Sequence, residues 1–237
     1  MIVVDWPGHG LSGPCVLPPT LGIRTHAITT LVSLLDELDL PEVDLVGHSL
    51  GAQFSLYAAH DLGSRVRRIV LLGAPGAGFS GVKPVPIMKL LATPGLGRAL
   101  LSAPMSENTF HRNQDLMLGP GALDESPPKL LEAAYLLAGR RSNAASLASF
   151  FRSLIRRGAV RDGVALSLDE LGRIQQPALF AWGDQDVFLT PSVAASSIVA
   201  IRDTRLLRLP TAGHAPWLQA DKLIGRAVAE HLNRITD

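Results

Sequence analysis

The chain has 237 residues, of which 47% are hydrophobic and 18% charged, and its formal net charge is +1. This length fits one large domain, or a core domain with a smaller one inserted, and the composition allows a substantial buried core. The near-neutral charge gives no reason to expect a nucleic-acid partner. No apolar run is long enough for a membrane span, and no charged and apolar leader opens the chain, so we expect a cytoplasmic protein.

The first predicted element is a strand at the very start of the chain. Residues 2–5 read Ile-Val-Val-Asp, a buried-strand pattern that runs into a Pro-Gly turn. A core strand this early means either that the fold begins inside its sheet or that the chain lacks what came before.

Helices and strands alternate over the next 70 residues. A helix is predicted over His26–Leu38, where four leucines share one face, and a second helix over residues 50–62. Strands are predicted over Val43–Val46 and in "VRRIVLLGAPGAG", which runs into a glycine loop. This alternation indicates a parallel sheet with helical crossovers.

The pattern changes between Gly76 and Gln176. Prolines cluster there, no segment reads clearly as a strand, and helices are predicted over Lys129–Ala138 and Ala144–Arg157. We interpret residues 76–176 as a helical cap inserted over a core formed by residues 1–75 and 177–237.

The alternation resumes after the insertion. Strands are predicted in "PALFAWGDQD" and "TRLLRLP", with helices near Ser192–Ile201 and from Asp221 to Arg234. The predicted fold class is α/β, with a mostly parallel sheet that carries helices on both faces.

The motif "GHSLG" at residues 47–51 is the most informative stretch. A serine between a buried strand and a helix lies in a sharp, strained turn, and we expect the flanking glycines to relieve the crowding. Ser49 is therefore a candidate nucleophile, and the N–H of Leu50 points toward the space where an oxyanion would form.

A serine nucleophile needs a base and a group that orients the base. "WGDQD" places Asp184 or Asp186 after one late strand, and "TAGHAPW" places His214 after the last strand. Because these loops lie at the carboxyl ends of parallel strands, we expect all three groups on one side of the sheet.

Taken together, these motifs resemble those of the α/β-hydrolase superfamily. "DWPGHGLS" is similar to the family's D-x-P-G-x-G-x-S segment, "GHSLG" to its nucleophile elbow, "WGDQD" to its G-x-x-D acid loop and "AGHAPWLQAD" to its histidine loop. The resemblance implies Ser49 as nucleophile, His214 as base and Asp186 as acid, since G-x-x-D counts from Gly183. It also implies that the insertion is the family's cap.

Several other residues have a structural alternative to a functional role. Ser49 alone would suit a helix N-cap, and Asp184 remains the alternative acid. The His9–Gly10 pair resembles the family's oxyanion loop, but its position 39 residues before Ser49 favours a structural turn. We expect His48 to pack locally and Cys15 to be a small loop residue rather than a catalytic thiol.

The predicted cap carries Arg152, Arg156 and Arg157, which suggest an anion clamp. On a helical wheel they lie opposite Leu147 and three other apolar residues, Phe150, Phe151 and Leu154, so we interpret them as a solvent-exposed face. Core packing explains those phenylalanines and Trp217 at least as well as an acyl pocket does.

In the family, three strands and a helix precede the D-x-P-G-x-G-x-S segment, and a loop among them donates the first oxyanion N–H. The resemblance therefore implies that about 50–80 residues are missing before Met1, with impaired activity as a consequence.

The sequence predicts a serine hydrolase that cleaves a small carboxylic ester or related acyl substrate through an acyl-enzyme. The alternative is a catalytically impaired remnant that binds a small molecule without turnover. No cofactor is implied, and no cluster of residues has metal-ligand spacing. A serine at position 49 disfavours reactions that need a carboxylate nucleophile; esterase, lactonase, thioesterase, peptidase, perhydrolase and C–C hydrolase chemistry stay open, as does the oligomeric state.

Overall fold

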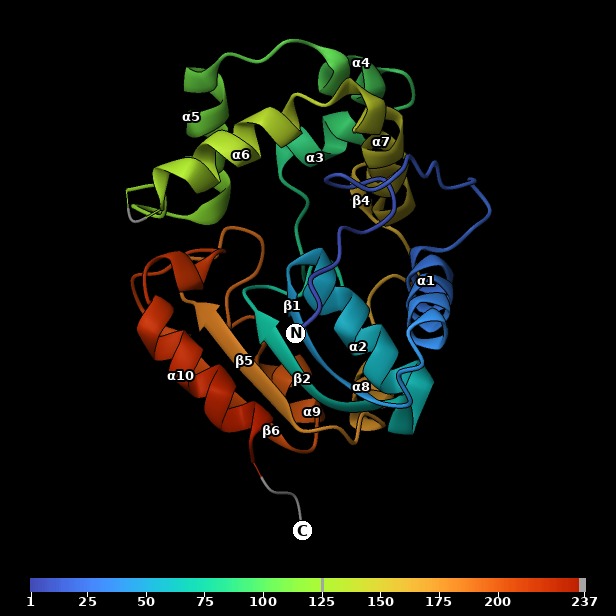
Figure 1. The fold of residues 1–237 in the computed structure, drawn as a ribbon, viewed down its shortest axis with the longest axis vertical. Helices are drawn as coiled ribbons and strands as arrows, with labels where there is room; N and C mark the ends of the chain where they lie inside the picture. Colours follow the sequence, from blue (N-terminus) through green and yellow to red (C-terminus); the bar gives the residue numbers. More distant parts are fainter. Residues whose placement is uncertain (125, 235–237) are drawn as a thin grey trace. The chain divides into compact units, whose positions relative to one another are not determined.

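The computed structural model describes residues 1–124 and 126–234, which form two compact units (Figure 1). Unit 1 comprises Met1–Ile23, Lys83–Asn113 and Ser126–Val164, and unit 2 comprises the other described residues. The predicted boundaries of a cap at residues 76–176 stay a prediction.

Unit 2 is built on a four-stranded sheet. Its strands are β1 (Val43–His48), β2 (Val66–Leu72), β5 (Ala178–Gly183) and β6 (Thr204–Leu209). They are all parallel and lie in the order β1-β2-β5-β6. The prediction of a parallel sheet is therefore confirmed, and the loops that follow these strands emerge at one edge.

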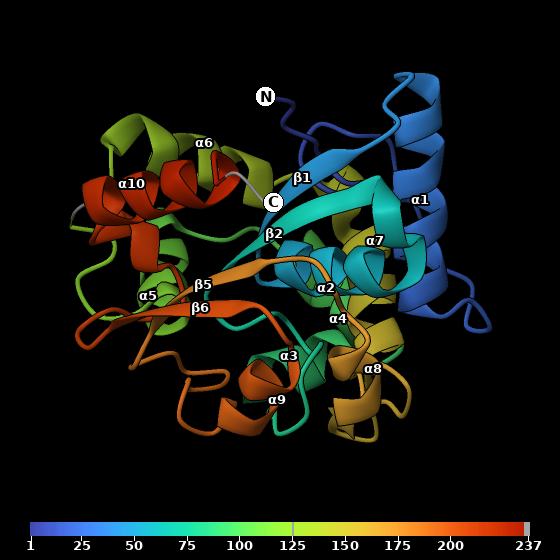
Figure 2. The same cartoon turned by 90° about the horizontal axis from the view of Figure 1, so that it is seen from below.

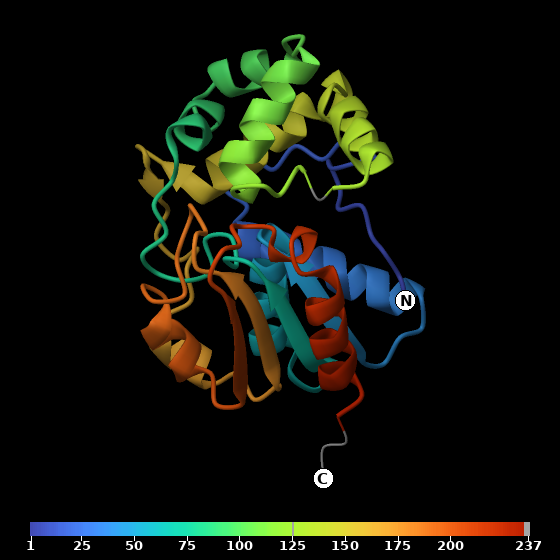
Figure 3. The same cartoon turned by 90° about the vertical axis from the view of Figure 1, so that its left-hand side faces the viewer.

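Helices cover both faces of this sheet, as predicted. They are α1 (Ile23–Glu37), α2 (Leu50–Leu62), α8 (Leu168–Gly172), α9 (Ala195–Ala200) and α10 (Asp221–Leu232), with short 3₁₀ turns η1 (Gly63–Arg65) and η3 (Pro216–Leu218). Helix α2 packs on β1 and β2, and α10 packs on β5 from the opposite face (Figure 2). Figure 3 shows α10, in red, running alongside the strands.

The core of unit 2 centres on β5, whose six residues are all buried. Phe180 and Trp182 from this strand stack on each other and Phe79 packs against both at a tilt, with ring centroids 5.9–6.1 Å apart. On the face of α10, Leu179 packs with Ala227. Burial of such side chains on both faces of one strand fixes the strand at the middle of the unit.

Unit 1 is mainly helical. Its elements are α3 (Pro86–Leu91), α4 (Leu96–Ser102), the start of α5 (Glu107–Leu118), α6 (Pro128–Ala138), the turn η2 (Arg141–Asn143), α7 (Ala144–Leu154) and a hairpin of β3 (Ile155–Arg156) and β4 (Ala159–Val160). Helix α4 packs on α3 and α7. No helix among the described residues is both long and apolar enough to cross a membrane.

The prediction of an opening strand was wrong. Residues 1–6 form no strand, and the side chain of Val3 is 85% exposed. Within the part of the chain that the structure describes, no strand pairs with this segment, so its apolar pattern has no sheet to pack into. Strand β1 is accordingly an edge strand there, with Val46 51% exposed.

The residues that follow the opening segment do form the predicted structural turn. The Asp5 carboxylate accepts the N–H of Leu11 at 2.8 Å, and the hydroxyl of Ser12 donates to the Asp5 carbonyl at 2.6 Å. Gly10 has φ +51°, and a Cβ there would lie 2.3 Å from the Asp5 carboxylate. The second glycine of the motif is therefore required by this turn.

Candidate active site

Ser49 lies in the sharp turn between β1 and α2, at φ 51° and ψ −113°. A non-glycine residue at positive φ is strained, and such strain persists only where the surroundings enforce it. Gly47 makes the turn possible, because a Cβ there would lie 2.4 Å from the backbone of Gly51. A Cβ at Gly51 itself would meet nothing within 4 Å, so the expected relief of crowding falls on the first glycine alone.

The side chain of Ser49 does not cap the helix. It makes no capping hydrogen bond, although it occupies the N-cap position of α2, and its dihedral angles lie outside the extended region typical of capping residues. The backbone carbonyl of Ser49 begins the helix by accepting the N–H of Gln53 at 3.0 Å. The hydroxyl is therefore not committed to holding the helix end.

His214 and Asp186 form a buried pair in the same unit. Nδ1 of His214 lies 2.8 Å from Oδ2 of Asp186, and their side chains are 5% and 0% exposed. A carboxylate at this nitrogen holds the Nδ1–H tautomer and leaves Nε2 free to accept a proton.

Three donors hold the Asp186 carboxylate. Besides His214, the N–H of Ala74 donates to Oδ2 at 2.9 Å and the N–H of Phe188 donates to Oδ1 at 3.0 Å. Burial alone would raise the pKa of Asp186, but these hydrogen bonds and the nearby imidazole outweigh it, so the pKa lies below its usual value. Asp186 therefore stays ionised beside His214 at neutral pH.

Asp184, the alternative acid, makes a different contact. Its carboxylate forms two hydrogen bonds with the Arg208 guanidinium, at 2.9 and 3.0 Å, and its N–H donates to the carbonyl of Leu209. The structure thus brings Asp186, and not Asp184, to His214.

His48 connects the serine turn to the histidine loop. Its Nε2 lies 3.1 Å from the carbonyl oxygen of His214, and its ring lies 4.7 Å from the His214 ring and 4.3 Å from the indole of Trp217. Burial, with a smaller contribution from His214, lowers the pKa of His48 to about 3. His48 is therefore neutral and packs locally, as predicted.

Sequence reasoning missed three residues that support the histidine. Phe188 packs edge-on against the His214 ring, with ring centroids 4.5 Å apart, and the N–H of Ala74 donates to Asp186. Gly73 leaves room for the backbone of His214, because a Cβ at Gly73 would lie 2.3 Å from the His214 carbonyl oxygen. The available signal was the Gly-Ala-Pro-Gly loop at residues 73–76, which directly follows β2 at the edge where the site forms.

Two predicted features are not visible as contacts. No hydrogen bond joins the Ser49 hydroxyl to the His214 ring in the described structure; such bonds are often long without substrate and tighten in the reacting complex. Leu50 is the first residue of α2, so its N–H has no partner within the helix. Its role toward an oxyanion stays a prediction.

Nothing in the described residues forms a metal centre, since no group of three His, Cys, Asp or Glu side chains is placed to hold an ion.

Cys15 is a free, half-buried thiol in the loop before α1, and its N–H donates to the hydroxyl of Ser146 at 2.9 Å. The arrangement at Ser49, Asp186 and His214 suits proton transfer and nucleophilic attack by its own side chains.

Comparison with known proteins identifies the relatives of this chain. It is 26% identical over 235 residues to a 2-hydroxy-6-oxononadienedioate/2-hydroxy-6-oxononatrienedioate hydrolase of Cupriavidus pinatubonensis, covering 98% of this chain and 75% of that protein. The structure of a 2-hydroxy-6-oxo-6-phenylhexa-2,4-dienoate hydrolase from Rhodococcus superposes with TM-score 0.75 at 18% identity, over 97% of this chain and 78% of that one.

A carboxylesterase from Bacillus subtilis has the same fold, with TM-score 0.67 at 19% identity over 96% of this chain and 72% of that one. The model of the alpha/beta hydrolase family matches residues 1–226, which is nearly the whole chain. With the parallel sheet and the strained serine turn, this match shows that the chain belongs to the α/β hydrolase family.

Proposed function

We propose that this α/β hydrolase is a serine hydrolase that cleaves a small carboxylic ester or related acyl substrate. Ser49 attacks the carbonyl carbon, His214 takes the proton of the hydroxyl, and Asp186 holds the imidazole in the Nδ1–H tautomer. The N–H of Leu50 stabilises the oxyanion, His214 then protonates the leaving group, and water hydrolyses the acyl-enzyme.

The observation that carries this proposal is the combination of a strained, uncapped serine with a buried Asp186–His214 pair in one compact unit. Burying the Asp186 carboxylate costs free energy that its hydrogen bonds must offset, and a positive φ at serine costs on the order of 1–3 kcal/mol. A catalytic role would account for both the strained serine and the buried Asp186–His214 pair.

A specific observation favours a second candidate substrate class. The Cupriavidus relative is named as a hydrolase of a 2-hydroxy-6-oxo-dienedioate, and this chain aligns over 75% of its length. A 2-hydroxy-6-oxo-dienoate also presents a carbonyl carbon for nucleophilic attack, so the same three residues would serve.

A cytoplasmic location also stays a prediction.

The experiment offers the purified chain a short-chain nitrophenyl ester and, separately, a 2-hydroxy-6-oxo-dienoate. Ester cleavage releases a coloured phenolate, and dienoate cleavage removes the absorbance of the conjugated chain. Ser49→Ala is the control, and it should abolish whichever turnover the wild-type chain shows. Turnover that survives this substitution would end the proposal.

The remnant hypothesis predicts a different result. A chain that melts cooperatively, binds either compound and yet turns over neither would support ligand binding without catalysis. Turnover of the dienoate alone would place the chain with its Cupriavidus relative and would exclude simple esters as the preferred class.

A further inference from the structure

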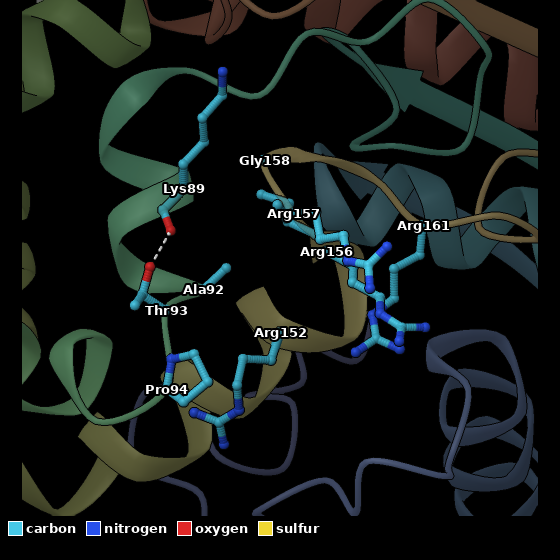
Figure 4. Close-up of a pocket in the computed structure, with 10 residues that line it drawn as sticks. Lys89, Ala92, Thr93, Pro94, Arg152, Arg156, Arg157, Gly158 and Arg161 are labelled. Atoms are coloured by element: carbon cyan, nitrogen blue, oxygen red, sulfur yellow. Dashed lines mark hydrogen bonds between the residues drawn. The ribbon is translucent and has the colours of Figure 1, made fainter.

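Unit 1 holds a cavity of about 410 Å³, and five of its ten lining residues are cationic (Figure 4). The residues come from the end of α3, the turn after it, the end of α7 and the β3–β4 hairpin. The cationic ones are Lys89, Arg152, Arg156, Arg157 and Arg161. This volume lies within the usual range for small-molecule sites.

Arg156 and Arg157 are exposed and Arg152 is half-buried, but the three do not share one helix face, as the sequence suggested. Helix α7 ends at Leu154, and Arg156 and Arg157 belong to the hairpin that follows it. The N–H of Arg161 donates to the carbonyl of Leu154 at 2.8 Å, which closes the base of the hairpin. The hairpin, Arg161 after it and α7 thereby supply four arginines to the lining of one cavity.

No carboxylate neutralises this cluster. Among the described residues none of its members forms an ion pair, whereas Arg24, Arg65 and Arg208 in unit 2 each contact an aspartate within 3.0 Å. Unit 1 contains eleven Lys and Arg residues and only four Asp and Glu residues. The cavity therefore concentrates positive charge that no ion pair among the described residues balances.

Arg161 supplies the most specific indication that the cavity suits an anion. Its Nε is buried and has no hydrogen-bond partner among the described residues. A buried N–H of a guanidinium without an acceptor is costly, because its water is lost and not replaced. An anion in the cavity would provide the acceptor.

The hairpin turn is also strained. Arg157 has φ +51° and Gly158 has φ +78°, so an arginine stands where such a turn would favour asparagine or glycine. Strain at a non-glycine residue is typical of sites where a side chain is held for a purpose. Lys89 packs its aliphatic stem against this turn, 3.7 Å from the position of a Cβ at Gly158.

We propose that this cavity binds a small organic molecule that carries a diphosphate group. Guanidinium groups bind phosphate oxygens through paired, charge-assisted hydrogen bonds, and several of them suit more than one phosphate. Ala92, Pro94 and the buried Ile155 provide apolar wall for the organic part. A concave site of this size fits a small molecule better than the extended backbone of a nucleic acid.

The test is calorimetric titration of the full chain with ADP, inorganic pyrophosphate and adenosine at two salt concentrations. ADP and pyrophosphate should bind and adenosine should not, with weaker binding at higher salt. Arg161→Gln and Arg152→Gln should each weaken binding about tenfold or more. Arg152 lies on α7 outside the hairpin, so it keeps the test valid if Arg161→Gln fails to fold.

Arg140→Gln is the matched control. Arg140 is an exposed arginine of unit 1 that does not line the cavity, and its loss changes the net charge equally. It should leave affinity within about twofold. Equal weakening by Arg140→Gln would overturn the proposal in favour of diffuse attraction to polyanions, and no binding of either phosphate at low salt would also overturn it. The heat of phosphate binding does not depend on Ser49, so this test can fail without affecting the proposed hydrolysis.

Discussion

At the scale of single residues, Asp184 and Asp186 differ through the partners that each carboxylate meets. Asp186 is enclosed by His214 and two backbone N–H groups, whereas Asp184 is 25% exposed and paired with Arg208. The spacing of the G-x-x-D motif from Gly183 favoured Asp186, but spacing alone left both aspartates as candidate acids. The hydrogen bonds of the folded chain separate them, because only one carboxylate reaches the imidazole.

Asp186→Asn should cost far more rate than Asp184→Asn. An asparagine at 186 favours the wrong His214 tautomer, and the corresponding loss in a serine protease is about 10⁴ in kcat. Asp184→Asn removes one partly exposed ion pair and should change kcat by less than about tenfold. The measurement is kcat of both variants on whichever substrate the wild-type chain turns over. A larger loss at position 184 would exchange their roles.

The two glycines of the serine turn should respond oppositely to alanine. Gly47→Ala forces a methyl group against the Gly51 backbone and should lower the free energy of unfolding by roughly 1–3 kcal/mol. Gly51→Ala meets no atom and should raise it by up to about 1 kcal/mol, through better helix propensity. Chemical denaturation of the two variants checks this. A destabilising Gly51→Ala would mean that the crowding extends into α2.

At the scale of elements, an ion-pair network joins three helices of unit 2. Arg24 of α1 contacts Asp61 of α2 at 2.5 Å and Glu170 of α8 at 2.6 Å. The hydrogen bond from Arg24, together with donors of Ser167, lowers the pKa of Glu170 to about 2. These contacts link residues far apart in sequence, so no local pattern could have predicted them.

Glu170→Gln should destabilise the protein at neutral pH and not at very low pH. Because the pKa of Glu170 is lower when folded, its contribution is present above the ordinary pKa near 4.5 and is lost as pH falls toward 2. The pair is partly exposed, so we expect about 1 kcal/mol, or a melting temperature lower by about 2–4 °C. Glutamine keeps an acceptor for the capping box with Ser167.

The measurement is the melting temperature of wild type and Glu170→Gln from pH 7 to pH 2. The difference should shrink below pH 4.5. Asp169→Asn is the control, since its partner Arg173 is 66% exposed and that pair should contribute little. A difference between wild type and Glu170→Gln that persists at pH 2 would show that the side chain acts through packing rather than charge.

Secondary structure was predictable where the hydrophobic period was long and uninterrupted. The pattern of residues 50–62 predicted α2 with the observed bounds, and the strand predicted in "VRRIVLLGAPGAG" is β2. It failed at residues 2–5, because a strand needs a paired neighbour that periodicity cannot show. It missed α3 and α4, short helices with proline or glycine at or near their starts that pack on each other and on α7, and it also missed α5.

The candidate site was more predictable than unit 1. Ser49, Asp186 and His214 lie in loops after strands, and their spacing within motifs follows from the turns themselves. Phe188 and Ala74 could not be found this way, because their contribution is an N–H or a ring placed by tertiary structure. The cationic cavity was missed because helix α7 was expected to continue through Arg157.

At the scale of the whole molecule, a net charge of +1 averages over two unlike units. Unit 1 has eleven basic and four acidic residues, which leaves eleven basic and seventeen acidic residues for the rest of the chain. The sequence average therefore gave no hint of an anionic ligand. Charge has to be summed over each compact unit before it says anything about partners.

Over the whole molecule, we expect only one serine to be reactive. A fluorophosphonate probe is attacked at a useful rate only by an activated hydroxyl. Ser12 donates its hydroxyl to the Asp5 carbonyl at 2.6 Å, and Ser55 donates to the carbonyl of Gly51 at 2.9 Å, so neither is poised for attack. The expected result is a single label, on Ser49.

Peptide mass mapping of the labelled chain locates the adduct, and Ser49→Ala should remove it. His214→Ala should also slow labelling strongly, because the hydroxyl then lacks its base, whereas His60→Ala, a histidine of α2 paired with Asp61, should not. A label on Ser12, Ser55 or Cys15 would refute the assignment of the nucleophile. Complete absence of label on a cooperatively folded chain would favour the remnant hypothesis, because the serine would then lack the activation that attack on the probe requires.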